Sequence, residues 1–287
     1  MPKLLFLTNI QNGAFSEDDL LIQLFREHFQ VIVRHPLNYE SAISMVDGII
    51  IRNIWPTHLY QLEWIKVETS IAQSNIYTYN PLIGKGDRMG KKYLIALFKS
   101  KYAVIPSVER VEDLLALGAP EYYWIKPQFG CDGFGASKVN ERKLKKLDLT
   151  GYIIQPYVEF SDEPSFFFID NIFVYAITMP NRLLDNNIEQ YEPTPEEIEW
   201  ARSFVEWNDL PYGIQRIDAV RTRDGQLLLT EIEDLCPYLY LESIDPVNRE
   251  NVLHKLKESI LRNMDDRMSY TEPSVASNPH PVGPVVV

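Results

Sequence analysis

The sequence predicts a mixed α/β fold, with an open α/β layer at the N-terminus and α+β segments after it. Three observations lead to this fold class. Short apolar runs alternate with segments of helical periodicity over the first quarter of the chain. Strand-forming residues then dominate two later stretches, Tyr152–Met179 and Ile214–Leu235. The chain has 287 residues, 45% of them hydrophobic, so it can bury a substantial core.

Strands and helices are predicted to alternate in the N-terminal part. Such alternation is typical of an open α/β layer, which binds ligands outside the carboxyl ends of its strands. Ser16 is the expected helix cap, because acidic residues follow it and apolar residues then recur at helical spacing. Glycines and a proline between Asn80 and Gly90 mark a boundary. The expected elements are strands at Lys3–Thr8, Gln30–Arg34 and Val46–Arg52, a helix after Ser16, and a helix from about Leu59 to Ala72.

The middle of the chain is predicted to combine two short helices with strands around a glycine-bearing loop. Ser107 is the expected cap of the second helix. The expected elements are helices at Lys91–Ser100 and Val108–Leu117, strands at Tyr122–Pro127 and Tyr152–Val158, and a loop at Gly130–Lys138.

The C-terminal part begins with two strands within Ser165–Met179, joined by a turn at Asp170-Asn171. Thr194 is then followed by proline and two glutamates, the pattern of a helix N-cap with proline at the first helical position. A last helix is expected from about Pro246 to Arg262. Beyond Tyr270 the composition predicts a mobile tail.

Composition excludes several classes of function. The net charge is −12, from 28 basic and 40 acidic residues, and no basic stripe appears, so we expect no binding to nucleic acid or to anionic membranes. No apolar stretch approaches the roughly 18 residues of a membrane span. Two cysteines are too few for a disulfide scaffold and favour a reducing compartment. The default expectation is a cytoplasmic protein.

The segment Ile214–Leu235 predicts a β-hairpin with Asp224 and Gly225 as a two-residue type I′ turn. Arg223 would then face Gln226. This register places Asp218 directly opposite Glu231, and Arg216 directly opposite Glu233, with all four side chains on one face.

Directly opposed carboxylates predict a cation site on this hairpin. Their Cβ atoms lie about 4.5–5.5 Å apart, so Asp218 and Glu231 repel unless a positive charge lies between them. Mg²⁺ prefers carboxylate oxygens. The alternative interpretation is an exposed hairpin with a charged face, closed by an Arg216–Glu233 ion pair.

Two further segments suggest a nucleotide site. Glycines at 130, 133 and 135 follow a strand that ends in Lys126-Pro127, so backbone N–H groups and a lysine could hold a polyphosphate. The spacing matches no standard phosphate-binding motif, and an ordinary flexible hairpin remains the alternative. The run Ile153–Val158 could expose backbone groups to a base edge, or it is a plain edge strand. Cys131 lacks an activating partner and is expected to be a bystander thiol.

The order of these features resembles the ATP-grasp superfamily over residues 1–262. Within it, the chain is similar to the glutathione-synthetase-like group that includes the cyclo-ligase of cycloserine biosynthesis. The resemblance is carried by Ile51–Trp55, Lys92-Tyr93-Leu94, the Gln155–Val158 hinge, Glu163–Phe166, Tyr212–Asp218, Leu229–Glu233 and Pro237–Leu239.

The resemblance implies ATP and Mg²⁺ as cofactors and assigns a role to each matching residue. The phosphates would be contacted by Lys92, Lys126 and the loop glycines Gly133 and Gly135. Adenine would be held by Gln155 and by the backbone of Tyr157 and Val158, and the ribose would be reached by Glu163. Mg²⁺ would be bound by Asp218, Glu231 and Glu233, the acceptor substrate would face Arg52, and the transferred phosphoryl group would face Arg182 or Arg216.

By the same resemblance, the chain would have a pre-ATP-grasp domain (1–86), a small subdomain with a glycine-rich lid loop (87–158), a C-terminal subdomain with the metal-binding hairpin (159–266) and a tail (267–287). The implied reaction is ligation of a small carboxylate to an amine through an acyl phosphate, in peptide or natural-product biosynthesis. The alternatives are a cyclo-ligase, a phosphotransferase or a non-catalytic nucleotide-binding module. The expected partners are small-molecule substrates, and the valines at 285–287 could pair with a second subunit in a homodimer.

Overall fold

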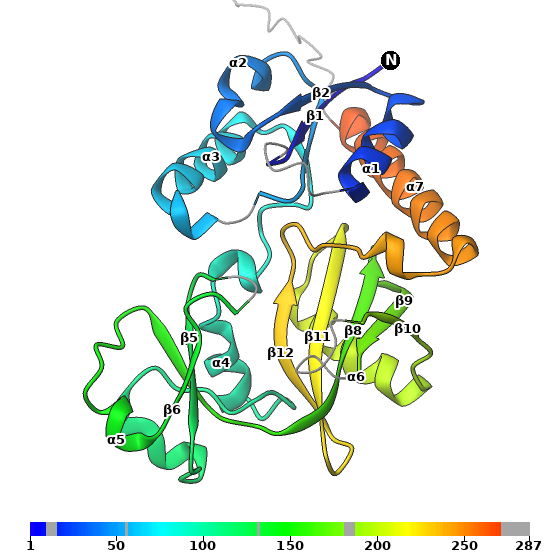
Figure 1. Ribbon diagram of the computed structural model, residues 1–287. Coiled ribbons are helices and arrows are strands. Elements are labelled where there is room, and N and C mark those ends of the chain that lie inside the picture. The colour runs from blue at the N-terminus through cyan, green and yellow to red at the C-terminus, as the bar shows by residue number, and fades with distance from the viewer. Residues whose placement is uncertain (10–15, 55–56, 131–132, 181–186, 271–287) are drawn as a thin grey trace, which may run out of the picture.

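The computed structural model describes residues 1–9, 16–54, 57–130, 133–180 and 187–270. These residues form three sheets of four, three and five strands that follow one another along the chain. In Figure 1 the first sheet and its helices form the upper part of the molecule, and the other two sheets lie below it. Within the described ranges, no helix is both long and apolar enough to cross a membrane.

The first sheet is the predicted α/β layer. Its strands are parallel in the order β2-β1-β3-β4, and α1 and α3 supply two of the crossovers that parallel strands require. Ser16 is the first residue of α1, where the sequence predicted the residue before the helix. The elements are β1 (Lys3–Leu7), α1 (Ser16–Arg26), β2 (Gln30–Arg34), α2 (Glu40–Ile43), β3 (Gly48–Ile51), α3 (Gln61–Ser74) and β4 (Tyr77–Tyr79).

The C-terminal helix α7 (Pro246–Tyr270) returns to this first sheet. Its residues Val252, Leu256 and Ile260 share one hydrophobic core with Leu4 of β1. Figure 1 shows α7 beside α1, at the opposite side of the sheet from α3. The N-terminal layer is therefore built from the first quarter of the chain together with this C-terminal helix.

The second sheet is a small antiparallel one with β5 at its centre and β6 and β7 at its edges. The helix predicted at 108–117 begins later, as a 3-10 helix at Val111–Leu117. Val108 instead exchanges two backbone hydrogen bonds with Ile154, so it extends the sheet. The elements are α4 (Tyr93–Lys99), β5 (Tyr123–Pro127), β6 (Ser137–Val139), α5 (Glu141–Leu144) and β7 (Tyr152–Pro156).

The third sheet is antiparallel in the order β10-β9-β8-β11-β12. The predicted turn at Asp170-Asn171 is confirmed, and both residues have positive φ (49° and 64°) as a type I′ turn requires. Helix α6 packs Ala201 and Phe204 onto the sheet. The elements are β8 (Phe160–Ile169), β9 (Ile172–Met179), β10 (Glu189–Tyr191), α6 (Pro195–Asn208), β11 (Ile214–Thr222) and β12 (Leu227–Glu233).

The hairpin of β11 and β12 has the predicted pairing where the carboxylates lie. Asp218 is opposite Glu231, and Arg216 is opposite Glu233. The pairing shifts by one residue between Asp218 and Ala219, which marks a β-bulge. Bulges bend a strand and re-aim its side chains, and they are common beside functional sites.

The turn of this hairpin differs from the prediction. The Thr222 N–H donates to the Gln226 carbonyl at 2.9 Å, so the loop has three residues instead of two. Within this fully described loop, Gly225 has positive φ (88°) and Asp224 does not, whereas a type I′ turn needs two such residues. The extra loop residue and the bulge compensate each other, which is why the predicted pairs still form.

Helix α6 offers a simple test of local stability. The Thr194 side chain accepts from the Glu197 N–H at 3.3 Å, and the Glu197 carboxylate accepts from the Thr194 N–H at 2.8 Å, forming a capping box. We predict that Thr194→Ala lowers the free energy of unfolding by about 1 kcal/mol. Urea denaturation measures the change, and Thr194→Ser, which keeps the hydroxyl, should stay near wild type. An unchanged midpoint for Thr194→Ala would show that the cap contributes nothing.

Candidate active site

A cleft of about 620 Å³ lies between the second and third sheets. This volume is typical of small-molecule and cofactor sites. One wall comes from β5, β7 and the glycine loop, and the other from β8, β11 and β12. Ten of the residues to which the resemblance gives a role line it: Lys126, Gly133, Gln155, Tyr157, Val158, Glu163, Arg216, Asp218, Glu231 and Glu233.

Lys91, and not Lys92, lines the cleft. The Lys92 side chain is 45% exposed and pairs with Glu109, whereas the Lys91 side chain is 5% exposed and lies among carboxylates. The resemblance assigns the phosphate contact to Lys92, but no local pattern decides which of two adjacent lysines faces the cleft. The structure instead places Lys91 just before α4, where its N–H donates to the Gln128 carbonyl.

Gly135 is not among the residues that line the cleft. Gly135 has a φ of 74°, and a Cβ there would come within 2.8 Å of Pro127, so it is a conformational glycine packed against the end of β5. Arg182 lies outside the described residues, as do Cys131 and the tail after Tyr270.

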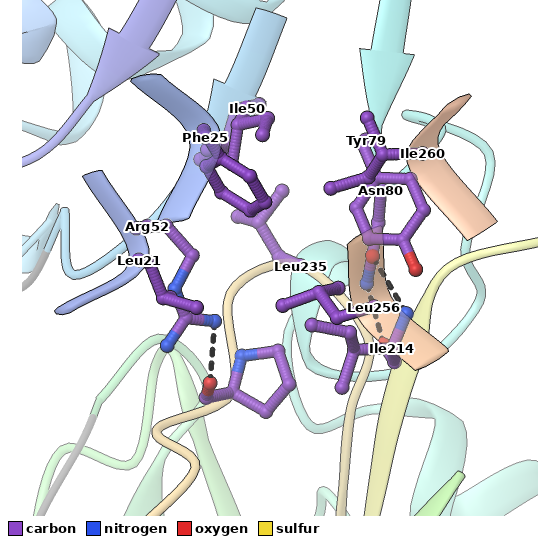
Figure 2. Close-up of a pocket in the computed structure, with 12 residues that line it drawn as sticks. Leu21, Phe25, Ile50, Arg52, Tyr79, Asn80, Ile214, Leu235, Leu256 and Ile260 are labelled. Atoms are coloured by element: carbon purple, nitrogen blue, oxygen red, sulfur yellow. Dashed lines mark hydrogen bonds between the residues drawn. The ribbon is translucent and has the colours of Figure 1, made fainter. Parts of the chain in front are cut away.

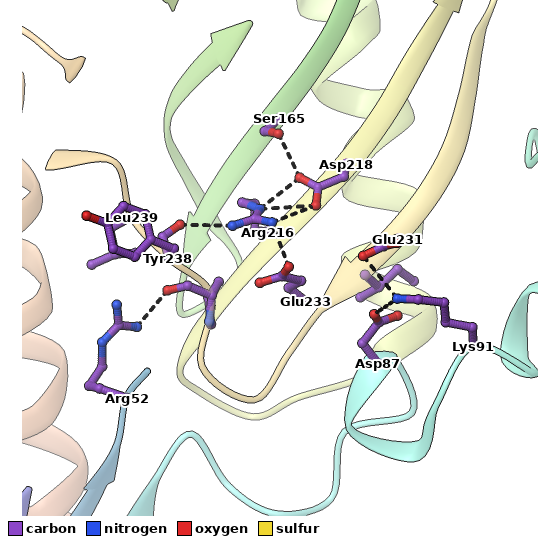
Figure 3. A network of polar contacts seen from close by, with 12 residues as sticks. Arg52, Asp87, Lys91, Ser165, Arg216, Asp218, Glu231, Glu233, Tyr238 and Leu239 are labelled. Atoms are coloured by element: carbon purple, nitrogen blue, oxygen red, sulfur yellow. Dashed lines mark hydrogen bonds and ion pairs between the residues drawn. The ribbon is translucent and has the colours of Figure 1, made fainter. Parts of the chain in front are cut away.

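Asp218, Glu231 and Glu233 form a cluster of carboxylates at one end of the cleft. Each offers an oxygen, and these three oxygens all lie within 4.8 Å of one another. The three side chains are partly buried, and Figure 3 shows them along the paired strands β11 and β12. Hard divalent cations such as Mg²⁺ bind carboxylate oxygens, so the donor set fits such an ion.

The Arg216 guanidinium balances the negative charge on one side of this cluster. Its Nε donates to Asp218 at 2.8 Å and its Nη2 donates to Glu233 at 2.6 Å. Asp218 also accepts from the Ser165 hydroxyl at 2.7 Å (Figure 3). The predicted Arg216–Glu233 pair therefore exists, within a larger network that fixes the orientation of the guanidinium group.

Two lysines balance the negative charge on the other side of the cluster. The Lys91 ammonium lies 3.0 Å from the Glu231 carboxylate and also contacts Asp87. The Lys126 ammonium lies 3.9 Å from the other oxygen of Glu231. The repulsion expected between Asp218 and Glu231 is thus offset by cations of the protein itself. Asp87 and Lys91 were missed from the sequence, although their separation of four residues would have suggested an ion pair.

Burial shapes the electrostatics of the cleft. It raises the pKa of Glu233 to about 8, despite the adjacent Arg216 guanidinium. Burial also raises the pKa of Glu231, but the nearby ammonium groups of Lys91 and Lys126 outweigh it and leave that pKa lowered. The pKa of Lys126 is lowered by burial. Such opposed shifts among neighbouring groups in a cleft are typical of functional sites.

The hinge after β7 forms the opposite end of the cleft. Gln155 is 1% exposed and its amide donates to the Ser107 hydroxyl at 2.9 Å. Ser107 does not cap a helix, because the 3-10 helix begins only at Val111. The Tyr157 N–H donates to the Tyr122 carbonyl. Among the described residues, the Val158 N–H and C=O groups have no hydrogen-bond partner, so Val158 is the hinge residue whose backbone can bind a ligand.

Lys138 was not singled out from the sequence but lines the cleft beside this hinge. Its ammonium lies 3.5 Å from the centre of the Tyr157 ring and 4.5 Å from that of Tyr122. These cation–π contacts hold the lysine over the hinge. Alternation along β6 could not predict that Lys138 lines the cleft, because its partners Tyr122 and Tyr157 belong to two other segments.

Arg52, predicted to face the acceptor substrate, is buried instead. It lies 2% exposed after β3, pairs with Glu17 and donates to the Pro237 carbonyl at 2.7 Å. Figure 2 shows this hydrogen bond at the edge of a cavity of about 10 Å³, between the first sheet and α7. The arginine is held in the junction between sheets, because its buried charge requires the Glu17 carboxylate.

No protein-family model and no curated protein matches the sequence. Solved structures do match nearly the whole chain. The crystal structure of D-cycloserine synthetase DcsG is 18% identical with a TM-score of 0.75, and the match covers 91% of this chain and 99% of that one. D-alanine–D-alanine ligase from Bacillus anthracis in complex with ATP is 13% identical with a TM-score of 0.65, covering 93% and 100%. This chain has the ATP-grasp fold.

A further ATP-grasp structure comes from Chryseobacterium gregarium, a RiPP-associated ligase in complex with ADP and a leader and core peptide. It is 13% identical with a TM-score of 0.59, covering 95% of this chain and 98% of that one. The resemblance inferred from the sequence is therefore confirmed for the fold.

The charge network predicts how metal-free stability responds to Glu231→Gln. Removing this carboxylate leaves Lys91 and Lys126 without their shared partner, so we expect the free energy of unfolding to fall. Breaking a fully buried pair costs about 3–5 kcal/mol, and we expect about 1–3 kcal/mol here, because the Glu231 side chain is 25% exposed.

Urea denaturation in the presence of a chelator measures this change. Glu109→Gln is the matched control, because Glu109 pairs with the half-exposed Lys92, and such surface pairs contribute about 0–1 kcal/mol. If Glu231→Gln is as stable as wild type or more stable, repulsion among the carboxylates dominates. Lys91 and Lys126 then do not balance the negative charge of the cluster.

Proposed function

We propose that this protein is an ATP- and Mg²⁺-dependent ligase that joins a carboxylate to an amine through an acyl phosphate. The observation that carries the proposal is the charge arrangement at one end of the cleft. Three carboxylates have oxygens within 4.8 Å of one another, and the ammonium groups of Lys91 and Lys126 both contact one of them, Glu231. The ATP-grasp fold around this cleft supports the same conclusion.

The cleft divides into a base end and a phosphate end. The Val158 backbone would bind adenine at the hinge, and Glu163 would reach the ribose from β8. At the other end, Lys91 and Lys126 would bind phosphate oxygens, and Asp218, Glu231 and Glu233 would hold Mg²⁺, which offsets the charge of the phosphates when bound.

The reaction needs position and charge more than a protein nucleophile. A carboxylate oxygen of the substrate attacks the γ-phosphorus, and the bond to ADP breaks. The amine then attacks the acyl carbon, phosphate leaves, and the amine loses a proton. Arg216 points its guanidinium at the carboxylate cluster and would face the transferred phosphoryl group. Its fixed orientation would stabilise charge that develops during the transfer.

The substrates of the matched ATP-grasp ligases suggest a class for this one. Their names refer to D-cycloserine, D-alanine and peptides, so we propose amino-acid-like or peptide substrates. An intramolecular attack, as in a cyclo-ligase, and a phosphotransferase remain alternatives on the same scaffold. The clustered carboxylates favour catalysis over a non-catalytic nucleotide-binding module, because simple nucleotide binding has less need for three of them.

The test is a screen in which ADP formation and product mass are read together. The protein is incubated with ATP, Mg²⁺ and pairs of amino acids or short peptides. ADP with a product lighter by one water than the two substrates supports intermolecular ligation, and loss of water from one substrate supports a cyclo-ligase. Phosphorylated product alone supports a phosphotransferase. Tight ATP binding without any ADP formation would overturn the proposal of an enzyme.

The adjacent lysines give a matched pair of variants. We predict that Lys91→Met weakens ATP binding about tenfold, equal to 1.4 kcal/mol, whereas Lys92→Met changes it less than about twofold. The reason is that Lys91 lies in the cleft and Lys92 pairs with Glu109 outside it. Calorimetric titration with a non-hydrolysable ATP analogue measures both. The reverse ranking would restore Lys92 as the phosphate ligand.

Mg²⁺ binding should depend on pH through Glu233. Its pKa is raised to about 8 in the metal-free protein, so the carboxyl group is largely protonated below that pH. A metal ligand must be deprotonated, so binding releases a proton. We predict that Mg²⁺ affinity rises as pH increases towards 8 and levels off above it.

Titration of Mg²⁺ in buffers of different ionisation enthalpy measures the released proton directly. Asp19→Asn, an exposed carboxylate outside the cleft, is the control and should release as many protons as wild type. Equal heats in all buffers at neutral pH would show that Glu233 does not lose a proton to the metal.

A further inference from the structure

The segment Pro237–Leu239, which follows β12, is held through its backbone by side chains from several elements. Figure 3 shows the segment between Arg52 on one side and Arg216 on the other. Arg52 donates to the Pro237 carbonyl at 2.7 Å, Arg216 donates to the Tyr238 carbonyl at 3.1 Å, the Leu239 N–H donates to Glu17 at 3.0 Å, and the Tyr175 hydroxyl donates to the Leu239 carbonyl.

The contacts on one side come from the N-terminal layer. Glu17 lies in the first turn of α1, and Arg52 follows β3. They pair with each other, and their side chains are 0% and 3% exposed. A buried ion pair contributes little net stability compared with apolar residues of similar volume. Their directed hydrogen bonds to a neighbouring backbone therefore indicate a role in orientation.

The contact on the other side reaches the carboxylate cluster. The Arg216 guanidinium uses Nε for Asp218, Nη2 for Glu233 and Nη1 for the Tyr238 carbonyl. Two of these partners belong to the carboxylate cluster, where a bound cation would compete for their oxygens. The Tyr238 carbonyl is a backbone group outside that competition, so it would still hold the guanidinium in orientation if the cluster held a metal ion.

We propose that Glu17 and Arg52 are positioning residues that fix the segment Pro237–Leu239 and, through the Tyr238 carbonyl, hold Arg216 in orientation for phosphoryl transfer. The N-terminal layer thereby acts on the reaction without contacting the nucleotide. The effect on turnover rests on the proposed function, whereas the effect on the segment does not.

The experiment combines hydrogen exchange with kinetics on the full chain. Glu17→Gln removes the charge and Arg52→Lys removes the forked donor. We expect either variant to raise amide exchange at Leu239 about tenfold, as a local opening becomes easier. We expect kcat to fall about tenfold with KM for ATP within about twofold, because the hinge and the two lysines that would bind ATP lie on other elements.

Asp19→Asn is the matched control, since it removes a charge from the same helical turn at an exposed position. It should alter neither exchange at Leu239 nor kcat. Glu17→Asp keeps the charge and shortens its reach, so it serves as the second variant if Glu17→Gln does not fold.

Each outcome decides the proposal. Unchanged exchange at Leu239 shows that the segment does not depend on Glu17 and Arg52. Faster exchange with unchanged kcat shows that Arg216 is oriented without them. A rise in KM for ATP equal to the fall in kcat indicates general damage and also contradicts the proposal. If the wild type consumes no ATP with any substrate pair, the proposed function fails, and the exchange rates alone decide whether Glu17 and Arg52 fix the segment.

Discussion

The structure depends on one electrostatic constraint, the placement of three carboxylates on two neighbouring strands. Asp218, Glu231 and Glu233 cannot share one end of a partly buried cleft without positive charge nearby. The protein provides that charge from two directions. Arg216 reaches the cluster from within the hairpin, and Lys91 reaches it from the segment before α4. The second and third sheets are joined by this compensation as well as by apolar packing.

The same constraint explains the arrangement of the surrounding elements. Asp234, the residue after Glu233, is fully buried and accepts from the Gly86 and Arg88 N–H groups at 2.7 and 3.0 Å. These bonds hold the 3-10 turn at Asp87–Met89 against the end of β12, so the partner of Lys91 is fixed in place. A Cβ on Gly84 would come within 2.1 Å of the Asp234 carboxylate, so the close approach requires glycine there. The loop and the hairpin thus form one unit.

Much of this arrangement could be predicted from the sequence, and the failures have physical causes. The predicted pairing of Asp218 with Glu231 is found although the predicted turn type is wrong. The β-bulge between Asp218 and Ala219 offsets the extra residue of the loop. Local patterns could not choose between Lys91 and Lys92, since only contacts with a distant strand distinguish them. The burial of Arg52 could not be foreseen for a related reason. Its partner Glu17 and its acceptor Pro237 are far apart in sequence, and no periodicity connects them.

We propose that Asp218, Glu231 and Glu233 hold Mg²⁺ beside the phosphates, and that Lys91, Lys126 and Arg216 balance their negative charge in the absence of ligand. The most direct measurement is a crystal structure of the protein with Mg²⁺ and ADP. We expect a metal ion about 2.0–2.1 Å from oxygens of Asp218, Glu231 and Glu233, with the Lys91 ammonium moved from Glu231 to a phosphate oxygen. ADP bound in the cleft with no metal at these carboxylates, or with Lys91 still paired to Glu231, would contradict it.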